Sequence, residues 1–280
     1  MNSVFNAAEN RASLERAYIN YTRAGIKVRG LITTNPHNPL GHYYSTEALL
    51  EIARFCNKHS IHMISDEIYA HSTYANEQFP NATTFNSILS LDLSEIIDQN
   101  LVHVLYGMSK DYGASGLRVG VLQSRNKNLT EAVSAINLLS WPSFMVQDMW
   151  ARVLEDTAFL QYFFRTYSER LTKSYSHVRG YMEDHGIEYF RGTNAGLFVW
   201  ARILPYPEDN GTDEYSKLKE RFLEICLGNG VNIADGDSFI PDNPENGWFR
   251  ITFSYDEDRL SVGLERLTRS LRQIKIEMLS

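Results

Sequence analysis

The residues of this chain best suited to chemistry are a lysine and an arginine eight positions apart, Lys110 and Arg118. Lys110 follows the apolar run Leu101–Leu105, and a second apolar run, Leu117–Leu122, carries the chain away. A lysine at the end of a buried strand is costly unless it has a task, because burial disfavours its charge. One such task is attack on a carbonyl by the neutral amine to form a Schiff base. The planar guanidinium of Arg118 would then suit a phosphate of the same ligand. Taken alone, two solvated cations on a strand–turn–strand explain the stretch more simply.

Three further side chains at predicted strand ends could share a site with Lys110. Asp66 lies three residues before Tyr69, a spacing that can point an acid and a phenol into one cleft. An acid can keep a pyridine nitrogen protonated, and a phenol can bind a ring oxygen by a hydrogen bond. Asn38 stands between two prolines and could be a fixed amide donor. The alternatives are a helix cap for Asp66, a core position for Tyr69 and a turn residue for Asn38.

Arg250 lies inside the aromatic and aliphatic run Trp248–Phe253. An arginine in a buried strand usually has a carboxylate partner. That partner is either an Asp or Glu of this chain, in a structural ion pair, or the carboxylate of a substrate held by two hydrogen bonds.

The order of the predicted elements indicates an α/β fold. Hydrophobic patterns predict a helix over Ala12–Ala24 capped by Ser13, strands at Val28–Thr33 and Ile61–Ile64, and a helix from Ser45 or Thr46 to about His59. Strands alternating with helices are typical of a parallel sheet, where function gathers beyond the carboxyl ends of the strands. The loop with Asn38, the segment with Asp66 and the turn with Lys110 all fall at such ends.

The pattern changes near residue 140, so we expect a large domain over 1–140 and a smaller C-terminal α/β domain over 141–280. The second domain is predicted to contain long helices within Ser143–His185, strands at Ile187–Phe190, Gly196–Ile203 and Trp248–Phe253, and helices at Glu214–Leu227 and Glu257–Glu277.

Composition excludes several classes of protein. The 280 residues carry a net charge of -7 with no basic run, which argues against a general affinity for nucleic acid or anionic membranes. The two cysteines, Cys56 and Cys226, lie in apolar patterns far apart and are typical of buried thiols in a reducing compartment. No apolar stretch approaches the roughly 20 residues that span a bilayer, and the first residues lack the layout of a signal peptide. We therefore expect a cytoplasmic protein that binds no metal.

Four motifs in order give the chain a family resemblance. It resembles the class I/II aminotransferases, pyridoxal-phosphate (PLP) enzymes of fold type I, and within them the 1-aminocyclopropane-1-carboxylate synthase-like branch. The motifs are Asn38–Gly41, Ser65–Tyr69, Ser109–Lys110 with Arg118, and Trp248–Arg250.

The resemblance implies a role for each residue. Lys110 would hold pyridoxal 5'-phosphate as a Schiff base and move the substrate's Cα proton. Asp66 would pair with the pyridine nitrogen, while Tyr69 and Asn38 would bind the ring oxygen beside the Schiff base. Arg118 would bind the cofactor phosphate, and Arg250 the α-carboxylate of an amino-acid substrate. The resemblance also implies a homodimer with shared sites.

Two departures from the family pattern stand out. The family usually has a hydroxyl residue three positions before the lysine, where this chain has Gly107. Family members also carry a long N-terminal part before the Asn-Pro loop, with strands, a phosphate loop and the aromatic residue that stacks on the cofactor. We expect that part to be absent here, which would leave an incomplete large domain with an unpaired sheet edge.

Three functions remain open at this stage. The first is an aminotransferase-type PLP enzyme acting on an α-amino-acid-type substrate. The second is a PLP-dependent lyase that catalyses β- or γ-elimination, for instance carbon–sulfur cleavage. The third is a truncated, non-catalytic fragment. A nucleotide-binding module is weakly supported, because no Gly-x-Gly-x-x-Gly follows a strand.

Overall fold

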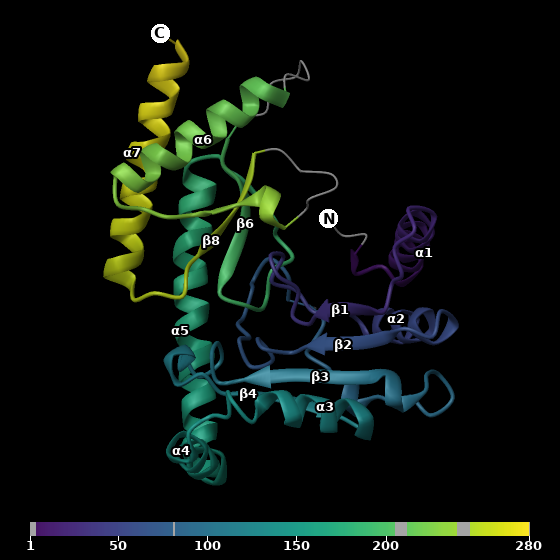
Figure 1. Ribbon diagram of the computed structural model, residues 1–280. Helices are drawn as coiled ribbons and strands as arrows, with labels where there is room; N and C mark the ends of the chain where they lie inside the picture. The colour runs from purple at the N-terminus through teal and green to yellow at the C-terminus, as the bar shows by residue number, and fades with distance from the viewer. Residues whose placement is uncertain (1–3, 81, 205–211, 240–246, 280) are drawn as a thin grey trace.

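The computed structural model describes residues 4–80, 82–204, 212–239 and 247–279. These residues form two four-stranded sheets with helices packed on them, an α/β architecture. We call the first sheet with its helices the large lobe, and the second sheet with its helices the small lobe. The long helix α5 (Thr157–Asp184) runs beside both lobes (Figure 1).

The large lobe holds the first sheet, in the order β1-β2-β3-β4. β1 pairs with β2 and β2 with β3 in parallel, whereas β4 returns antiparallel to β3. The strands are β1 (Gly30–Thr34), β2 (His62–Asp66), β3 (Val102–Gly107) and β4 (Gly120–Ser124), and the helices are α1 (Ala7–Arg23), α2 (Thr46–Lys58) and α3 (Lys127–Asn137).

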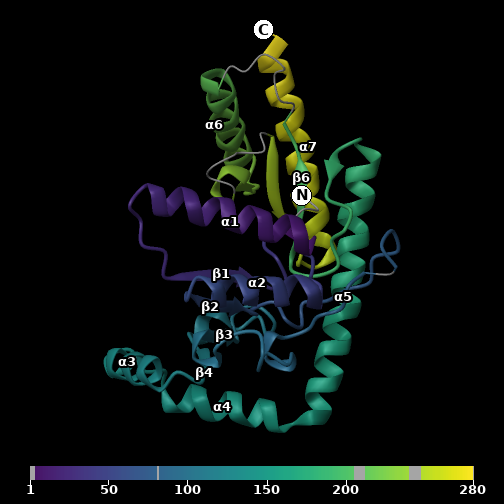
Figure 2. The same ribbon diagram turned by 90° about the vertical axis from the view of Figure 1, so that its right-hand side faces the viewer.

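One face of this sheet is covered by α2. The Ser45 hydroxyl caps α2 by accepting a hydrogen bond from the Ala48 N–H at 3.1 Å. The apolar side of α2 packs on the strand residues Met63 and Val104, and α1 lies over α2 (Figure 2). Residues on the opposite face of the sheet are more open, because Ile32 is 65% exposed and Leu105 is 37% exposed. β1 and β4 lie at the two edges of the sheet.

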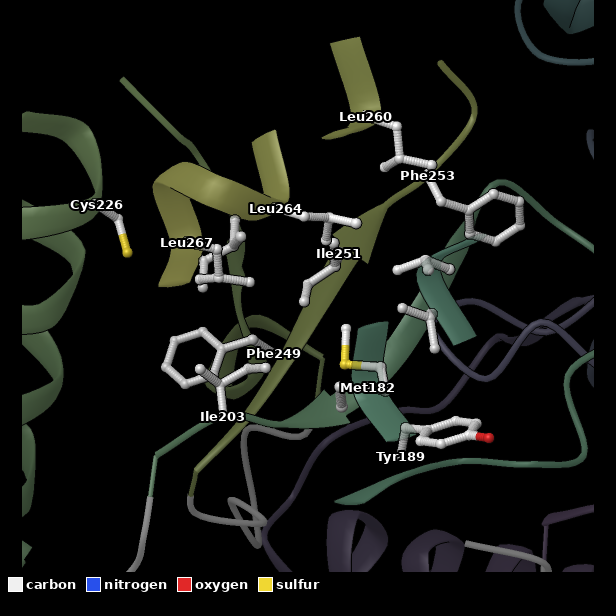
Figure 3. Packing of buried hydrophobic residues seen from close by; sticks show 14 of the residues in the cluster. Met182, Tyr189, Ile203, Cys226, Phe249, Ile251, Phe253, Leu260, Leu264 and Leu267 are labelled. Carbon is white, nitrogen blue, oxygen red and sulfur yellow. The ribbon is translucent and has the colours of Figure 1, made fainter. Parts of the chain in front are cut away.

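The small lobe holds an antiparallel sheet in the order β5-β6-β8-β7. Alternate residues of β8 face opposite ways. Phe249, Ile251 and Phe253 pack with leucines of α7 in the lobe's core (Figure 3), whereas Trp248 packs on the other side with Leu40 of the large lobe. Beside α5, the elements are α4 (Phe144–Glu155), β5 (Glu188–Tyr189), β6 (Phe198–Arg202), α6 (Thr212–Gly228), β7 (Ala234–Asp235), β8 (Trp248–Thr252) and α7 (Glu257–Leu279).

The structure corrects one detail of the sequence-based prediction and adds two that the prediction lacked. α1 begins at Ala7 rather than near Ala12, because the Asn6 side chain accepts hydrogen bonds from the N–H groups of Ala8 and Glu9, and Ser13 therefore does not cap it. Helix α3 was not predicted. β4 runs antiparallel to β3, from which residues 108–119 separate it. The domain boundary near residue 140 stays a prediction.

The expectation of buried thiols is confirmed. Cys56 and Cys226 are both free and buried. Burial raises the pKa of the Cys56 thiol to about 12 and that of Cys226 to about 11, so both are protonated at neutral pH.

The loop that carries Asn38 is fixed to the small lobe through Gly41. The carbonyl oxygen of Gly41 accepts hydrogen bonds from the N–H groups of Asn194 at 2.8 Å and Ala195 at 2.9 Å. Gly41 has φ +60°, and a Cβ there would lie 2.5 Å from the Ala195 carbonyl oxygen and 2.7 Å from the Thr193 hydroxyl. Both the backbone conformation and the space therefore require glycine at this position.

Replacing Gly41 with alanine is expected to lower the free energy of unfolding by about 2–4 kcal/mol, because the variant combines strain at positive φ with a collision against backbone. Urea denaturation of the full chain measures this loss. Gly186→Ala is the matched control, because Gly186 has a similar φ of +61° but nothing within 4 Å of the added Cβ. Equal losses in the two variants would show that the collision at Gly41 contributes nothing.

Candidate active site

Lys110 lies in the loop between β3 and β4, at the carboxyl end of β3. The loop is closed at its base by the hydrogen bond from the Met108 N–H to the Val119 carbonyl at 3.3 Å. The Gly113 N–H donates to the Lys110 carbonyl at 3.0 Å and forms the turn after the lysine. The Lys110 side chain is exposed, and its Nζ lies 5.8 Å from the centroid of the Tyr69 ring. The structure thus brings together two of the residues predicted for the site.

Gly107, the departure from the family pattern, has a structural reason here. A Cβ at this position would lie 2.7 Å from the Val119 carbonyl oxygen and 3.2 Å from the Gly120 Cα on the neighbouring strand. β3 and β4 approach too closely for any side chain. A hydroxyl at position 107 is therefore excluded by the backbone of this chain.

Asp66 and Tyr69 lie at the end of β2 and directly after it. Asp66 is the last residue of β2, and its Oδ1 accepts a hydrogen bond from the Ile68 N–H at 3.2 Å. Burial raises the pKa of Asp66, while the bond from Ile68 and the charge of Lys110 oppose that rise. Burial likewise raises the pKa of Tyr69, and the charge of Arg250 opposes it. The Tyr69 ring packs edge-on against Phe198 of the small lobe at 5.5 Å. Tyr69 therefore lies between Lys110 and the small lobe.

Asp66→Asn is expected to raise the melting temperature of the cofactor-free protein at neutral pH. The pKa of Asp66 lies above its usual value of 3.8, so the folded state holds this proton over a pH range where the unfolded state releases it. Stability is then lost as the pH rises from about 3.8 through the folded-state pKa, and asparagine removes that loss. Melting temperatures measured against pH should show a gap between variant and wild type at pH 7 that closes below pH 3.8. A gap that persists in acid would contradict the explanation.

Arg250 and Asn38 meet across the two lobes. The Arg250 Nη1 donates a hydrogen bond to the Asn38 Oδ1 at 2.9 Å. The guanidinium lies between the rings of Phe198 and Phe239, 5.0 and 4.8 Å from their centroids. Its Nε is buried and has no hydrogen-bond partner in the part of the chain that the structure describes.

The structural ion pair considered for Arg250 is not observed. No carboxylate of the described residues forms a salt bridge with this guanidinium, whose partner here is the neutral Asn38. A buried donor without a partner costs free energy that a bound carboxylate would recover. Among the described residues, the guanidinium therefore has no carboxylate partner that would compete with a bound carboxylate.

Arg118 is at the same end of the sheet but separate from the other residues. It is exposed, has φ +55°, and its Nη1 donates to the Ser115 carbonyl at 2.9 Å. Among the described residues, no hydrogen bond or ion pair joins its side chain to Lys110, Asp66 or Tyr69. Its predicted role as a phosphate ligand stays a prediction.

Sequence analysis missed the two rings that flank Arg250. Phe198 lies on β6, and its alternation with Trp200 is a signal that both side chains face one way. Phe239 follows the short helical turn Gly236–Ser238, and nothing in the sequence indicates its contact with Arg250.

Other possible ligand sites lie elsewhere. A cavity of about 780 Å³ lies between α5 and α7, and a cavity of about 670 Å³ lies beside Phe190. Neither cavity is lined by Lys110, Asp66 or Arg250. Within the described ranges, no group of three or more His, Cys, Asp or Glu could hold a metal ion. Among the described helices, none is both long and apolar enough to cross a membrane.

The two lobes and the lysine at a strand end define an α/β protein with the architecture of PLP transferases. The sequence matches the family Aminotransferase class I and II over residues 9–267, and the chain belongs to that family. Members of this family use pyridoxal phosphate.

Relatives in the family resemble this chain over about half their length. The chain is 33% identical to 1-aminocyclopropane-1-carboxylate synthase of Nicotiana tabacum over 91% of this chain and 50% of that protein. It is 34% identical to 1-aminocyclopropane-1-carboxylate synthase-like protein 1 of Mus musculus, over 92% of this chain and 49% of that protein. It is also 34% identical to the probable inactive 1-aminocyclopropane-1-carboxylate synthase-like protein 2 of Mus musculus, over 89% of this chain and 41% of that protein.

Solved structures confirm the fold. The aromatic aminotransferase from Pyrococcus horikoshii matches with a TM-score of 0.71 and 22% identity, over 92% of this chain and 64% of that one. The aspartate aminotransferase from Thermus thermophilus with maleate matches with a TM-score of 0.69 and 20% identity, over 90% of this chain and 59% of that one.

Proposed function

We propose that this chain is a PLP-dependent enzyme of aminotransferase type that acts on an α-amino-acid substrate. The observation that carries the proposal is the arrangement at the lobe junction, where Lys110 lies beside Tyr69 and Arg250 presents an unpaired Nε. The donor set fits the cofactor, because it combines an amine, a half-buried acid and a phenol at adjoining strand ends. Bound there, PLP would withdraw electrons from the substrate carbon that loses its proton.

Each residue would have a separate task. The Lys110 Nζ would hold the cofactor covalently and, once released by the substrate, take up and return the Cα proton. Asp66 would pair with the pyridine nitrogen. Tyr69 and Asn38 would orient the cofactor by hydrogen bonds to the ring oxygen, and Arg118 would bind the phosphate. Arg250 would fix the substrate carboxylate, so that the Cα proton is presented to the amine.

Covalent capture of PLP tests the proposal. The full chain is incubated with PLP, reduced with borohydride and digested, and the labelled peptide is identified by mass spectrometry. We expect the label at Lys110. Absence of a label at saturating PLP, or a label spread over surface lysines such as Lys58 and Lys127, would overturn the proposal.

A lyase is the second candidate, and the products distinguish it. Transamination converts the amino acid into a 2-oxo acid without release of ammonia, whereas β- or γ-elimination releases ammonia together with the 2-oxo acid. Incubating the PLP-loaded chain with a panel of amino acids and assaying both products decides between them.

A non-catalytic role is the third candidate, and one observation favours it. One related protein, the synthase-like protein 2 of Mus musculus, is named as probably inactive. In such a protein Lys110 would not capture PLP, so the same experiment decides. Dimerisation, which the family resemblance implies, is part of the proposal, and sedimentation at micromolar concentration tests it.

A further inference from the structure

Asp111, the residue after Lys110, carries a buried carboxylate that the proposed function does not use. It is 1% exposed. Its Oδ1 accepts a hydrogen bond from the Ser72 hydroxyl at 2.6 Å. Its Oδ2 accepts two more, from the His71 backbone N–H and from the Tyr106 hydroxyl, both at 2.9 Å. All three donors are neutral, so the carboxylate is buried without a salt-bridge partner among the described residues.

These contacts join three parts of the chain at the carboxyl ends of the strands. His71 and Ser72 belong to the segment after β2, and Tyr106 lies near the end of β3. The Ser72 hydroxyl also contacts the Tyr167 hydroxyl of α5 at 3.0 Å, and the His71 ring stacks on Phe164 of α5 at 4.2 Å. In Figure 1 the arrowheads of β2 and β3 point towards α5. Asp111 thus lies where both strand ends meet the long helix.

The hydrogen bond between the Asp111 carboxylate and the His71 N–H links the two chain segments that carry Lys110 and Tyr69. Asp111 adjoins Lys110, and His71 follows Tyr69 by two residues, while the Lys110 Nζ lies 5.8 Å from the Tyr69 ring centroid. Fixing Asp111 against His71 therefore fixes the backbone of Lys110 against the backbone near Tyr69. The exposed Lys110 side chain has no hydrogen bond of its own in the described structure, so its placement depends on this backbone anchor.

We propose that Asp111 is a positioning residue, which sets where the Lys110 amine lies relative to Tyr69 by binding the segment after β2. The proposal rests on the proposed function of Lys110. A carboxylate suits the task because it only accepts hydrogen bonds and so matches three converging donors. Burial raises the pKa of Asp111, and the bonds from Ser72, His71 and Tyr106 oppose that rise.

Two substitutions separate position from charge. Asp111→Asn can keep every contact: its amide oxygen accepts from His71 and Tyr106, and its amide nitrogen donates to Ser72, whose hydroxyl then donates to Tyr167. Asp111→Ala removes all three bonds. If position matters, asparagine behaves like the wild type and alanine does not. Tyr106→Phe deletes a single donor and gives an intermediate variant should alanine prevent folding.

Asn76→Ala is the matched control for a general loss of stability. The Asn76 side chain is also buried, and its Nδ2 lies within hydrogen-bond distance of the Tyr175 hydroxyl and of the backbone carbonyls of Arg191 and Thr193. It should lower the melting temperature without affecting Lys110.

The first measurement needs no cofactor. Lysines are dimethylated with ¹³C, and the Lys110 signal is assigned by its loss in Lys110→Arg. The Tyr69 ring should shift this signal, and Tyr69→Leu defines the unshifted position. We expect Asp111→Ala to move the signal towards that position and to remove hydrogen-exchange protection at the His71 amide, whereas Asp111→Asn and Asn76→Ala keep both. This result stands even if the chain captures no PLP, so failure here is distinct from failure of the proposed function.

The second measurement is the rate of PLP capture at Lys110. A misplacement of about 1 Å can cost about 100-fold, so we expect a fall of about 10- to 100-fold in Asp111→Ala and a smaller fall in Tyr106→Phe. Asp111→Asn and Asn76→Ala should stay close to wild type. Wild-type capture and signal position in Asp111→Ala would overturn the proposal. So would equal losses in the asparagine and alanine variants, which would assign the effect to charge.

Discussion

Lys110→Arg is expected to abolish covalent capture of PLP and to lower turnover by about 10³-fold or more, because arginine stays protonated and offers no nucleophilic amine. The Lys110 side chain is exposed, so the substitution leaves the core and the charge of the loop unchanged. Capture is measured by borohydride labelling, and turnover by formation of the 2-oxo acid.

Lys58→Arg is the control for this experiment. Lys58 is an exposed lysine at the end of α2, where it forms a salt bridge with Glu15 at 2.6 Å. Its replacement should change neither capture nor turnover. Capture that moves to another lysine in Lys110→Arg with activity retained would show that Lys110 is not the catalytic amine.

The second large effect is expected at Arg250. Arg250→Ala should raise the KM for an amino-acid substrate by about 10²-fold, because the substrate carboxylate loses a charged donor in a partly buried place. Arg250→Lys should restore only part of the loss, since a lysine lacks the planar fork that binds two oxygens at once. PLP capture should remain near the wild-type level in both variants, because the proposed contact of Arg250 is with the substrate.

Arg202→Lys provides the comparison for Arg250. Arg202 lies on the adjacent strand β6 and forms a salt bridge with Glu188 at 3.4 Å. Its replacement should leave the KM unchanged. A KM that stays constant in Arg250→Ala would remove this residue from the substrate site, and a loss of PLP capture would assign it to the cofactor instead.

Hydrophobic periodicity predicted most of the elements, because each depends on local sequence. The helix after Ser45 has a clear apolar side, and it begins at Thr46 with Ser45, one of the two predicted caps, as its cap. α1 was placed too late because Ser13 was taken as its cap, whereas the Asn6 side chain caps it by accepting hydrogen bonds from the N–H groups of Ala8 and Glu9. The direction of β4 was not predicted.

The sequence predicted those residues of the candidate site that lie at the carboxyl ends of neighbouring strands. In parallel strands the ends of β2 and β3 lie together, which explains why Asp66, Tyr69 and Lys110 gather. The partner of Arg250 could not be predicted, because Asn38 is 212 residues away in sequence and belongs to the other lobe. The hydrogen bonds of Asp111 could not be predicted either, because two of its partners, His71 and Ser72, are about 40 residues away in sequence. A single acid next to a lysine has no distinctive pattern.

If Arg250 binds the substrate carboxylate as proposed, its hydrogen bond to Asn38 would make substrate recognition depend on the orientation of the two lobes. One partner is mounted on β8 of the small lobe and the other on a loop of the large lobe. A rotation of a few degrees between the lobes would therefore move Arg250 relative to Asn38, whereas it would leave Lys110 in place within the large lobe. Crosslinks or crystal contacts that lock the lobes apart would weaken substrate affinity while sparing cofactor attachment.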